Sequence, residues 1–330
     1  MRLPKNWAWT GTETGSEKHQ GRAIGSCFTP RRGGAKTELF MFYKIDDWDR
    51  AYSNASHIHR SDRWPDAWVA PAAKFRQDMT ELGRAVLDQP YGSGQRQRFD
   101  LFLPEGKPRG LFVFVHGGYW HTLDRSYWSH LAAGPLAHGY AVAMPGYTLC
   151  PEVRITDIGR EIAQAVDTAA AQVEGPIVMA GHSAGGHLVA RVCALGSTLS
   201  EQARSRLSMV IPISGLSDLR PFLRLKMNES LRLDAEEAMR ESPALLHPPE
   251  GLRMCCWVGA SERAEFLRQN RLLASIWAGL GAEVAIWEEP DKHHFDICDA
   301  LATSEHQIHG LYDQAQPSRD IRTWSNESAA

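Results

Sequence analysis

The residues of this sequence that could do chemistry centre on a serine in a glycine-rich turn. Gly181-His-Ser-Ala-Gly-Gly186 follows the apolar run Pro176–Ala180 and opens Gly186–Leu195, a stretch of helical character. A strand, a sharp turn with a serine and a helix form a nucleophile elbow, in which glycines on either side of the serine let strand and helix approach closely. The pentapeptide also arises by chance, so its place between strand and helix carries the inference. The pattern predicts Ser183 as a nucleophile.

A catalytic serine also needs donors for the negative oxygen of its tetrahedral intermediate, because a serine hydroxyl is a poor nucleophile at neutral pH. The loop His116-Gly-Gly-Tyr-Trp120 follows a buried apolar run, and it is a variant of the His-Gly-Gly-Gly loop of esterases. We expect the backbone amides of Gly118 and Tyr119, together with that of Ala184, to form the oxyanion hole. Losing one such donor typically costs about 3 kcal/mol of transition-state stabilisation.

The partners of the serine are expected further along the chain, each beyond the end of a strand. The run Arg253–Gly259 leads into a loop with Glu262, and Glu283–Glu289 leads into a loop with His294. Open α/β sheets place their sites at the carboxyl ends of strands, so the order serine, acid, histidine fits a catalytic triad. We expect His294 to accept the serine proton and return it to the leaving group, while Glu262 fixes the imidazole tautomer.

Both partners have rivals in the same loops. His293 precedes His294 and could also act as the base. If Glu262 is a solvated loop carboxylate, other polar residues have to be considered in its place: Ser261, Asp291 and Asp296.

Several neighbouring side chains have expected supporting roles. Tyr119 and Trp120 are expected beside the acyl or aryl pocket, as substrate-binding residues. His182 and His187 flank the serine and are expected to pack or hydrogen-bond locally.

The elements that must position these residues alternate between strand and helix. Apolar spacing predicts a helix over Ile155–Val173, and the strand Gln97–Leu103 alternates as an edge strand would. Alternating β and α elements predict an α/β fold, with a mostly parallel sheet and helices on both faces. Residues 217–247 turn charged and helical, and we expect them to form a small helical cap over the site. The remaining predicted strands are Leu111–Val115, Tyr140–Met144, Pro176–Ala180, Met209–Ser214, Arg253–Gly259 and Glu283–Glu289.

Five motifs together resemble the kynurenine formamidase, or arylformamidase, branch of the α/β-hydrolases and the bacterial esterases close to it. The resemblance runs from about residue 45 to about residue 302. In the animal formamidases an aspartate stands where this chain has Glu262, and both acids serve in this fold. The motifs are His116–Trp120, Gly181–Leu188, Ser214–Pro221, Val258–Phe266 and His294–Asp296.

The resemblance implies an α/β-hydrolase fold and hydrolysis without a cofactor. The implied reaction is hydrolysis of N-formyl-L-kynurenine to kynurenine and formate, which belongs to tryptophan catabolism. A carboxylesterase for short acyl esters is the alternative within enzymes, and a non-catalytic binding protein of the same fold is a further one. Histidine followed by phenylalanine matches the family at His294, which favours His294 over His293. Independently of the resemblance, Arg220 or Arg224 in the cap could hold the carboxylate of an amino-acid substrate, but we expect either one to be a solvated surface residue.

The composition agrees with a soluble enzyme that binds a small ester or formamide. The chain has 330 residues, 43% of them hydrophobic and 23% charged, enough for one large domain with a sizeable core. A net charge of −3 without a basic stripe argues against nucleic acid as a partner. The longest apolar runs fall far short of the roughly 20 residues that cross a bilayer, so no membrane partner is expected. A homodimer remains open.

The cysteines and histidines indicate neither disulfides nor a metal. Six irregularly spaced cysteines, several in predicted core elements, favour reduced thiols and a cytoplasmic location. His57 and His59 have the spacing of ligands on a strand, but no third ligand stands nearby, so we expect surface histidines and no metal.

The two ends of the chain differ from the middle. Residues 1–40 hold seven Lys or Arg, three Glu and six Gly, which predicts a disordered basic extension. A start of translation at Met41, ahead of a hydrolase domain over residues 41–313, is an alternative. Residues 314–330 are polar and are expected to fray.

Overall fold

The computed structural model describes residues 44–313. A compact unit begins at Asp47. The predicted basic extension over residues 1–40, the alternative start at Met41 and the polar tail over residues 314–330 lie outside the described residues.

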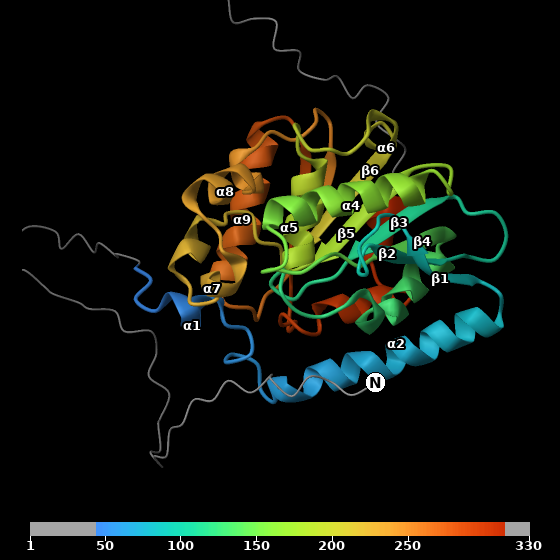
Figure 1. Cartoon of the computed structure of the whole chain (residues 1–330), viewed down its shortest axis with the longest axis horizontal. Helices are drawn as coiled ribbons and strands as arrows, with labels where there is room; N and C mark the ends of the chain where they lie inside the picture. The colour runs from blue at the N-terminus through green and yellow to red at the C-terminus, as the bar shows by residue number, and fades with distance from the viewer. Residues whose placement is uncertain (1–43, 314–330) are drawn as a thin grey trace, which may run out of the picture. The chain divides into compact units, whose positions relative to one another are not determined.

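The described chain contains an eight-stranded sheet with the order β1-β2-β4-β3-β5-β6-β7-β8 (Figure 1). β2 pairs antiparallel with both β1 and β4, and the other neighbouring strands pair in parallel. The prediction of a mostly parallel sheet is therefore confirmed. The strands are β1 (Ala85–Pro90), β2 (Arg98–Phe102), β3 (Gly110–Val115), β4 (Tyr140–Pro145), β5 (Ile177–His182), β6 (Leu207–Ile213), β7 (Arg253–Gly259) and β8 (Glu283–Glu289).

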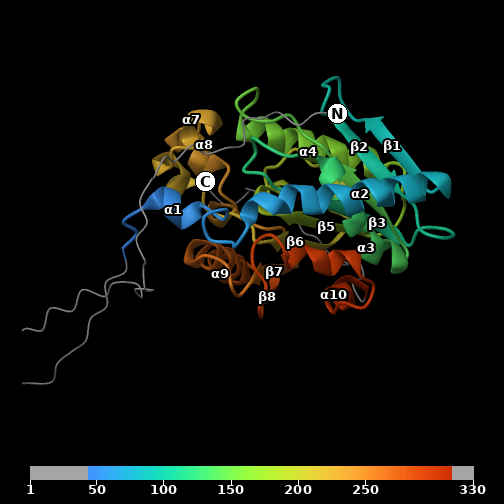
Figure 2. The same ribbon diagram turned by 90° about the horizontal axis from the view of Figure 1, so that it is seen from below.

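Helices bury both faces of this sheet. In β3 the odd-numbered residues join a core with α4, α5 and α9, whereas the even-numbered residues join a second core with α2, η3 and α10. Figure 2 shows α4 and α10 on opposite sides of the strands. Burial on both faces explains why the central strands are continuous apolar runs rather than alternating ones. The α-helices are α1 (Trp48–Tyr52), α2 (Trp64–Glu81), α3 (Ala133–Ala137), α4 (Ile155–Ala170), α5 (Ala184–Cys193), α6 (Glu201–Arg204), α7 (Asn228–Leu231), α8 (Ala235–Arg240), α9 (Ala264–Gly279) and α10 (Ile308–Asp313). The 3₁₀ helices are η1 (Ser61–Arg63), η2 (Arg125–Tyr127), η3 (Ser129–Ala132), η4 (Arg220–Arg224), η5 (Pro243–Leu245) and η6 (Ile297–Ala302).

The expectation of an edge strand over Gln97–Leu103 is wrong. β2 lies between β1 and β4, and β1 forms the edge. The polar residue that produced the alternation, Asp100, is fully buried and forms an ion pair with Arg76 of α2. The carboxylate of Asp100 thus lies in the core, where its ion pair compensates for burial, whereas the alternating pattern predicted that it faces solvent.

The segment predicted as a cap contains η4, α7, α8 and η5. It contacts α1, because Asp49 accepts a hydrogen bond from the backbone N–H of Lys226 at 2.8 Å. The ring of Tyr52, also in α1, packs on Phe222 of η4 at 4.9 Å between ring centres. Figure 1 shows α7 and α8 clustered beside α1 at one end of the sheet.

The described cysteines are free and buried. Burial raises the pKa of Cys150, Cys193 and Cys255 to about 12, and it also raises the pKa of Cys256 and Cys298. Cys27 lies outside the described residues. Within residues 44–313, helices long and apolar enough to cross a membrane are absent.

Candidate active site

Ser183 occupies a strained turn between β5 and α5. Its backbone adopts φ 57° and ψ −116°, a conformation that costs a non-glycine residue about 1–3 kcal/mol and that the surroundings must impose. Its N–H donates to the carbonyl of Ile213 in β6 at 2.8 Å, and its carbonyl accepts from the N–H of His187 at 3.0 Å. The predicted elbow is therefore present in the geometry of the chain.

The glycines around Ser183 lie where a side chain cannot fit. A Cβ atom at Gly181 would stand 2.3 Å from the carbonyl oxygen of Gly185, and one at Gly185 would stand 2.0 Å from that of Val115. At Gly186 it would meet the Cα of Gly215 at 2.8 Å. These approaches hold β3, β5, β6 and α5 close together beneath the serine.

Gly185→Ala is therefore expected to destabilise the fold by about 3 kcal/mol or more, since backbone atoms at the end of β3 would have to move. Thermal unfolding monitored by circular dichroism measures the effect. The matched control is Gly159→Ala in α4, where a Cβ would meet nothing within 4 Å and the change should be neutral or mildly stabilising. Equal melting temperatures for the two variants would contradict this account of the elbow.

Glu262 and His294 form a buried pair on the neighbouring loops. His294 Nδ1 lies 2.7 Å from Glu262 Oε2, and the Glu262 side chain has no exposed surface. The other carboxylate oxygen, Oε1, accepts from the N–H of Gly259 at 3.0 Å and from the hydroxyl of Ser214. A carboxylate can only accept, so the proton of a neutral His294 lies on Nδ1 and leaves Nε2 as a base.

The rival residues are not part of this pair. His293 Nδ1 lies 3.0 Å from the carboxylate of Asp296, which also accepts the backbone N–H of His293 at 2.7 Å. The carbonyl of Ser261 lies 3.0 Å from His57 Nε2, and Asp291 is exposed. The structure thus pairs Glu262 with His294 and, separately, the two rival residues His293 and Asp296 with each other.

His182 connects the elbow to His294. Its Nε2 donates to the backbone carbonyl of His294 at 2.9 Å, and the two ring centres are 4.6 Å apart. Burial lowers the pKa of His182 well below its usual value, so the ring is neutral. Ser183 follows His182 directly, so the bond from His182 to His294 also connects the loop of the expected base to the nucleophile turn.

The predicted oxyanion loop lies against the elbow. A Cβ at Gly117 would meet the carbonyl oxygen of His182 at 2.9 Å and the Cβ of Ser183 at 3.1 Å. The next three residues all have positive φ: 114° at Gly118, 48° at Tyr119 and 60° at Trp120. This bend turns the loop sharply at the point nearest to the serine.

The side chains of Tyr119 and Trp120 both anchor the loop to neighbouring elements. The Tyr119 hydroxyl donates to the carbonyl of Tyr52 at 2.6 Å and accepts from Asn54 at 3.1 Å. Trp120, predicted beside the pocket, is fully buried and packs on Phe222 of η4 with ring centres 5.4 Å apart. Trp120 therefore supports the loop from within the core and does not line an open pocket in this structure.

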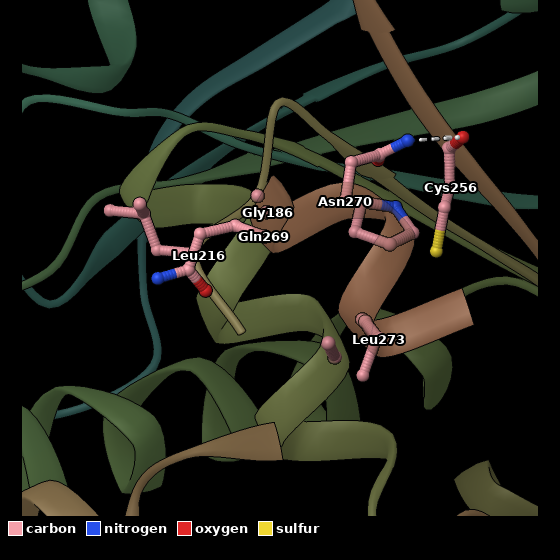
Figure 3. Close-up of a pocket in the computed structure, with 9 residues that line it drawn as sticks. Gly186, Leu216, Cys256, Gln269, Asn270 and Leu273 are labelled. Carbon is pink, nitrogen blue, oxygen red and sulfur yellow. Dashed lines mark hydrogen bonds between the residues drawn. The ribbon is translucent and has the colours of Figure 1, made fainter. Parts of the chain in front are cut away.

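A cavity between α5 and α9 lies behind the elbow (Figure 3). Its volume is about 10 Å³, room for about one water molecule and too small for a substrate. Figure 3 shows the side chain of Asn270 in α9 directed at Cys256 in β7. The side-chain amide of Asn270 donates to the backbone carbonyl of Cys256 at 3.1 Å. The cavity is a packing gap rather than a binding site.

Sequence reasoning missed Ser214 as a partner of the acid. Ser214 follows the end of β6 and has φ 49°, and its hydroxyl donates to Glu262. The available signal was its position, since polar residues just past the ends of parallel strands collect at the site. His57 and His59 are in turns rather than on a strand, and among the described residues there is no group of three metal-ligating side chains.

Comparison with known proteins identifies a family and several relatives of this chain. The alpha/beta hydrolase family matches residues 112–323. The kynurenine formamidase of Salmo salar is 26% identical over 279 residues, covering 80% of this chain and 93% of that protein. The kynurenine formamidase of Drosophila melanogaster is 26% identical over 288 residues, covering 80% and 95%.

Two solved structures are also similar to this chain. A protein of Silicibacter sp. TM1040, provisionally named a thioesterase, is 47% identical and covers 80% of this chain and 98% of its own, with a TM-score of 0.77. A Thermogutta terrifontis esterase, 18% identical with a TM-score of 0.51 over 65% of this chain and 84% of its own, shares the fold. The chain belongs to the alpha/beta hydrolase family, as a hydrolase similar to the kynurenine formamidases.

Proposed function

We propose that this hydrolase is a cofactor-independent arylformamidase with Ser183, Glu262 and His294 as its catalytic triad. The observation that carries the proposal is the buried Glu262–His294 pair beside the strained turn of Ser183. The proposed substrate, N-formyl-L-kynurenine, is supported by the likeness to kynurenine formamidases across 80% of the chain.

The geometry supports a two-step reaction. Ser183 Oγ attacks the formyl carbon as His294 Nε2 takes the hydroxyl proton, and Glu262 stabilises the imidazolium that forms. The amides of Gly118, Tyr119 and Ala184 are the proposed donors to the oxyanion. The intermediate collapses, the C–N bond breaks, and the proton on the imidazolium passes to the aniline nitrogen. A water molecule then gives a proton to the imidazole as it attacks the formyl ester. The C–O bond to Ser183 breaks, the imidazolium returns its proton to Ser183 Oγ, and the product leaves as formic acid, which ionises to formate.

A carboxylesterase for short acyl esters is the second candidate, and the cap supplies an observation in its favour. Both arginines that could hold a substrate carboxylate already have partners. Arg220 makes two hydrogen bonds of 2.9 Å to the carboxylate of Asp218, and the guanidinium of Arg224 lies 5.2 Å from the ring centre of Trp48. Thioesters are a related class, given the provisional name of the Silicibacter protein.

One assay distinguishes these substrate classes. It compares the hydrolysis of N-formyl-L-kynurenine with that of p-nitrophenyl acetate, p-nitrophenyl butyrate and a short acyl thioester. We expect kcat/KM for the formamide to exceed about 10⁴ M⁻¹s⁻¹ and to be lost in Ser183→Ala. Turnover of esters or thioesters alone would leave the triad proposal standing and replace the formamide by that substrate class.

The buried free thiols support a reducing compartment, and we propose the cytoplasm.

A further inference from the structure

The imidazole of His187, near the start of α5, forms a hydrogen bond at each of its two nitrogens. His187 is 1% exposed, and its backbone N–H binds the carbonyl of Ser183 one turn earlier. Its Nδ1 accepts from the indole N–H of Trp120 at 3.2 Å, and its Nε2 lies 2.7 Å from the backbone carbonyl of Glu241. One imidazole therefore connects the nucleophile's helix, the oxyanion loop and the end of the cap helix α8.

The two contacts define a single protonation state. An indole N–H can only donate and a carbonyl can only accept, so Nδ1 is unprotonated and Nε2 carries the proton. Burial lowers the pKa of His187 to about 4. The neutral ring thus keeps the same direction of hydrogen bonding throughout the neutral pH range.

The oxyanion loop needs such an external contact. Positive φ at three successive residues, two of them not glycine, persists only where neighbouring groups impose it. The backbone of Trp120 is also fixed, since its carbonyl accepts from the N–H of Cys150 at 2.9 Å. The bond to His187 fixes the indole and so the loop that precedes it.

The other end of the connection is equally rigid. Glu241 caps α8 and is 2% exposed. Its carboxylate accepts from Arg191 Nε at 2.8 Å and from the hydroxyl of Thr156 at 2.9 Å. The carbonyl that accepts the hydrogen bond from His187 Nε2 therefore belongs to a residue whose side chain is itself held in place.

We propose that His187 is a positioning residue that sets the oxyanion loop against the nucleophile through Trp120, with the cap carbonyl of Glu241 fixing its tautomer. The inference rests on the proposed oxyanion hole. Because those donors act most strongly on the charge of the transition state, displacing them lowers kcat more than it raises KM.

Two substitutions separate the two bonds. In His187→Asn the amide oxygen lies near the former Nδ1 and can still accept from Trp120, whereas in His187→Gln the amide nitrogen lies near the former Nε2 and can still donate to Glu241. With p-nitrophenyl acetate we expect His187→Gln to lower kcat about 30-fold, with KM changed less than about threefold. The Asn variant should keep a kcat at least about tenfold above that of the Gln variant.

A second pair of variants tests the same bond from the loop. Trp120→Phe removes the indole donor and leaves His187 intact, and we expect a fall in kcat similar to that of His187→Gln. The double variant Trp120→Phe/His187→Gln should be no slower than either single variant, because both remove one bond. The matched control is His309→Asn, a histidine that is also 1% exposed and bonded at both nitrogens but belongs to α10, where only the melting temperature should change.

The outcomes separate this inference from the proposed function. Equal kcat values for the Asn and Gln variants, an effect confined to KM, or additive losses in the double variant would overturn the positioning role. The activity of Ser183→Ala is measured in parallel in each case. If that variant keeps its activity, the triad itself is wrong, whereas its inactivity with unchanged His187 variants would refute only the role of His187.

Discussion

Ser183→Ala is expected to lower kcat by about 10⁶-fold while the protein remains folded. Alanine removes the nucleophile but keeps a Cβ, so the turn at φ 57° is as strained as before and its backbone bonds are unaffected. Hydrolysis of p-nitrophenyl acetate and labelling by a fluorophosphonate measure the loss, and both should disappear together.

The matched control for this variant is Ser208→Ala. Ser208 is also buried, and its hydroxyl donates to the carbonyl of Ile177 at 3.1 Å within the sheet. We expect normal turnover and labelling from Ser208→Ala with a small loss of stability. Labelling that persists in Ser183→Ala would assign the nucleophile to another residue.

Glu262→Gln is expected to lower kcat by about 10³- to 10⁴-fold. The carboxylate receives three donors, from His294, Ser214 and the N–H of Gly259. An amide has only one accepting atom, so in either orientation its NH₂ group faces a donor. Turned toward His294, that group favours the tautomer with the proton on Nε2, which cannot take the proton of Ser183.

Glu289→Gln is the control for this second variant. Glu289 is buried as well and contacts a histidine outside the triad, with Oε1 3.2 Å from His306 Nε2 and Oε2 2.8 Å from the indole N–H of Trp257. The kcat of Glu289→Gln should stay near that of the wild type. If Glu262→Gln kept more than about a tenth of the wild-type kcat at an unchanged melting temperature, Glu262 would not orient the base.

The central strands could be predicted because the chain there carries a strong local signal. β3, β5 and β7 are short apolar runs, each followed by residues of distinctive chemistry, and parallel strands bring those following loops to one edge of the sheet. The order of Ser183, Glu262 and His294 along the chain therefore sufficed to propose the pair that the structure places in contact.

The elements that cover the site were harder to predict, because long-range contacts form them. α2 has a proline inside it, at Pro71, which usually marks a helix end. α1 is a five-residue helix whose role becomes visible only when the Tyr52 carbonyl meets the Tyr119 hydroxyl across 67 positions of sequence. The bond between Trp120 and His187 spans the same separation, and no local pattern encodes it.

Because the cysteines are buried, the rate of their alkylation can be used to measure local unfolding of this enzyme. An alkylating reagent reacts with thiolate, and in the folded chain the five described thiols are both covered and held protonated. Cys255 and Cys256 face opposite cores from adjacent positions of β7, and Cys193 ends α5. The rates at which these thiols become reactive therefore report the opening of each side of the sheet separately.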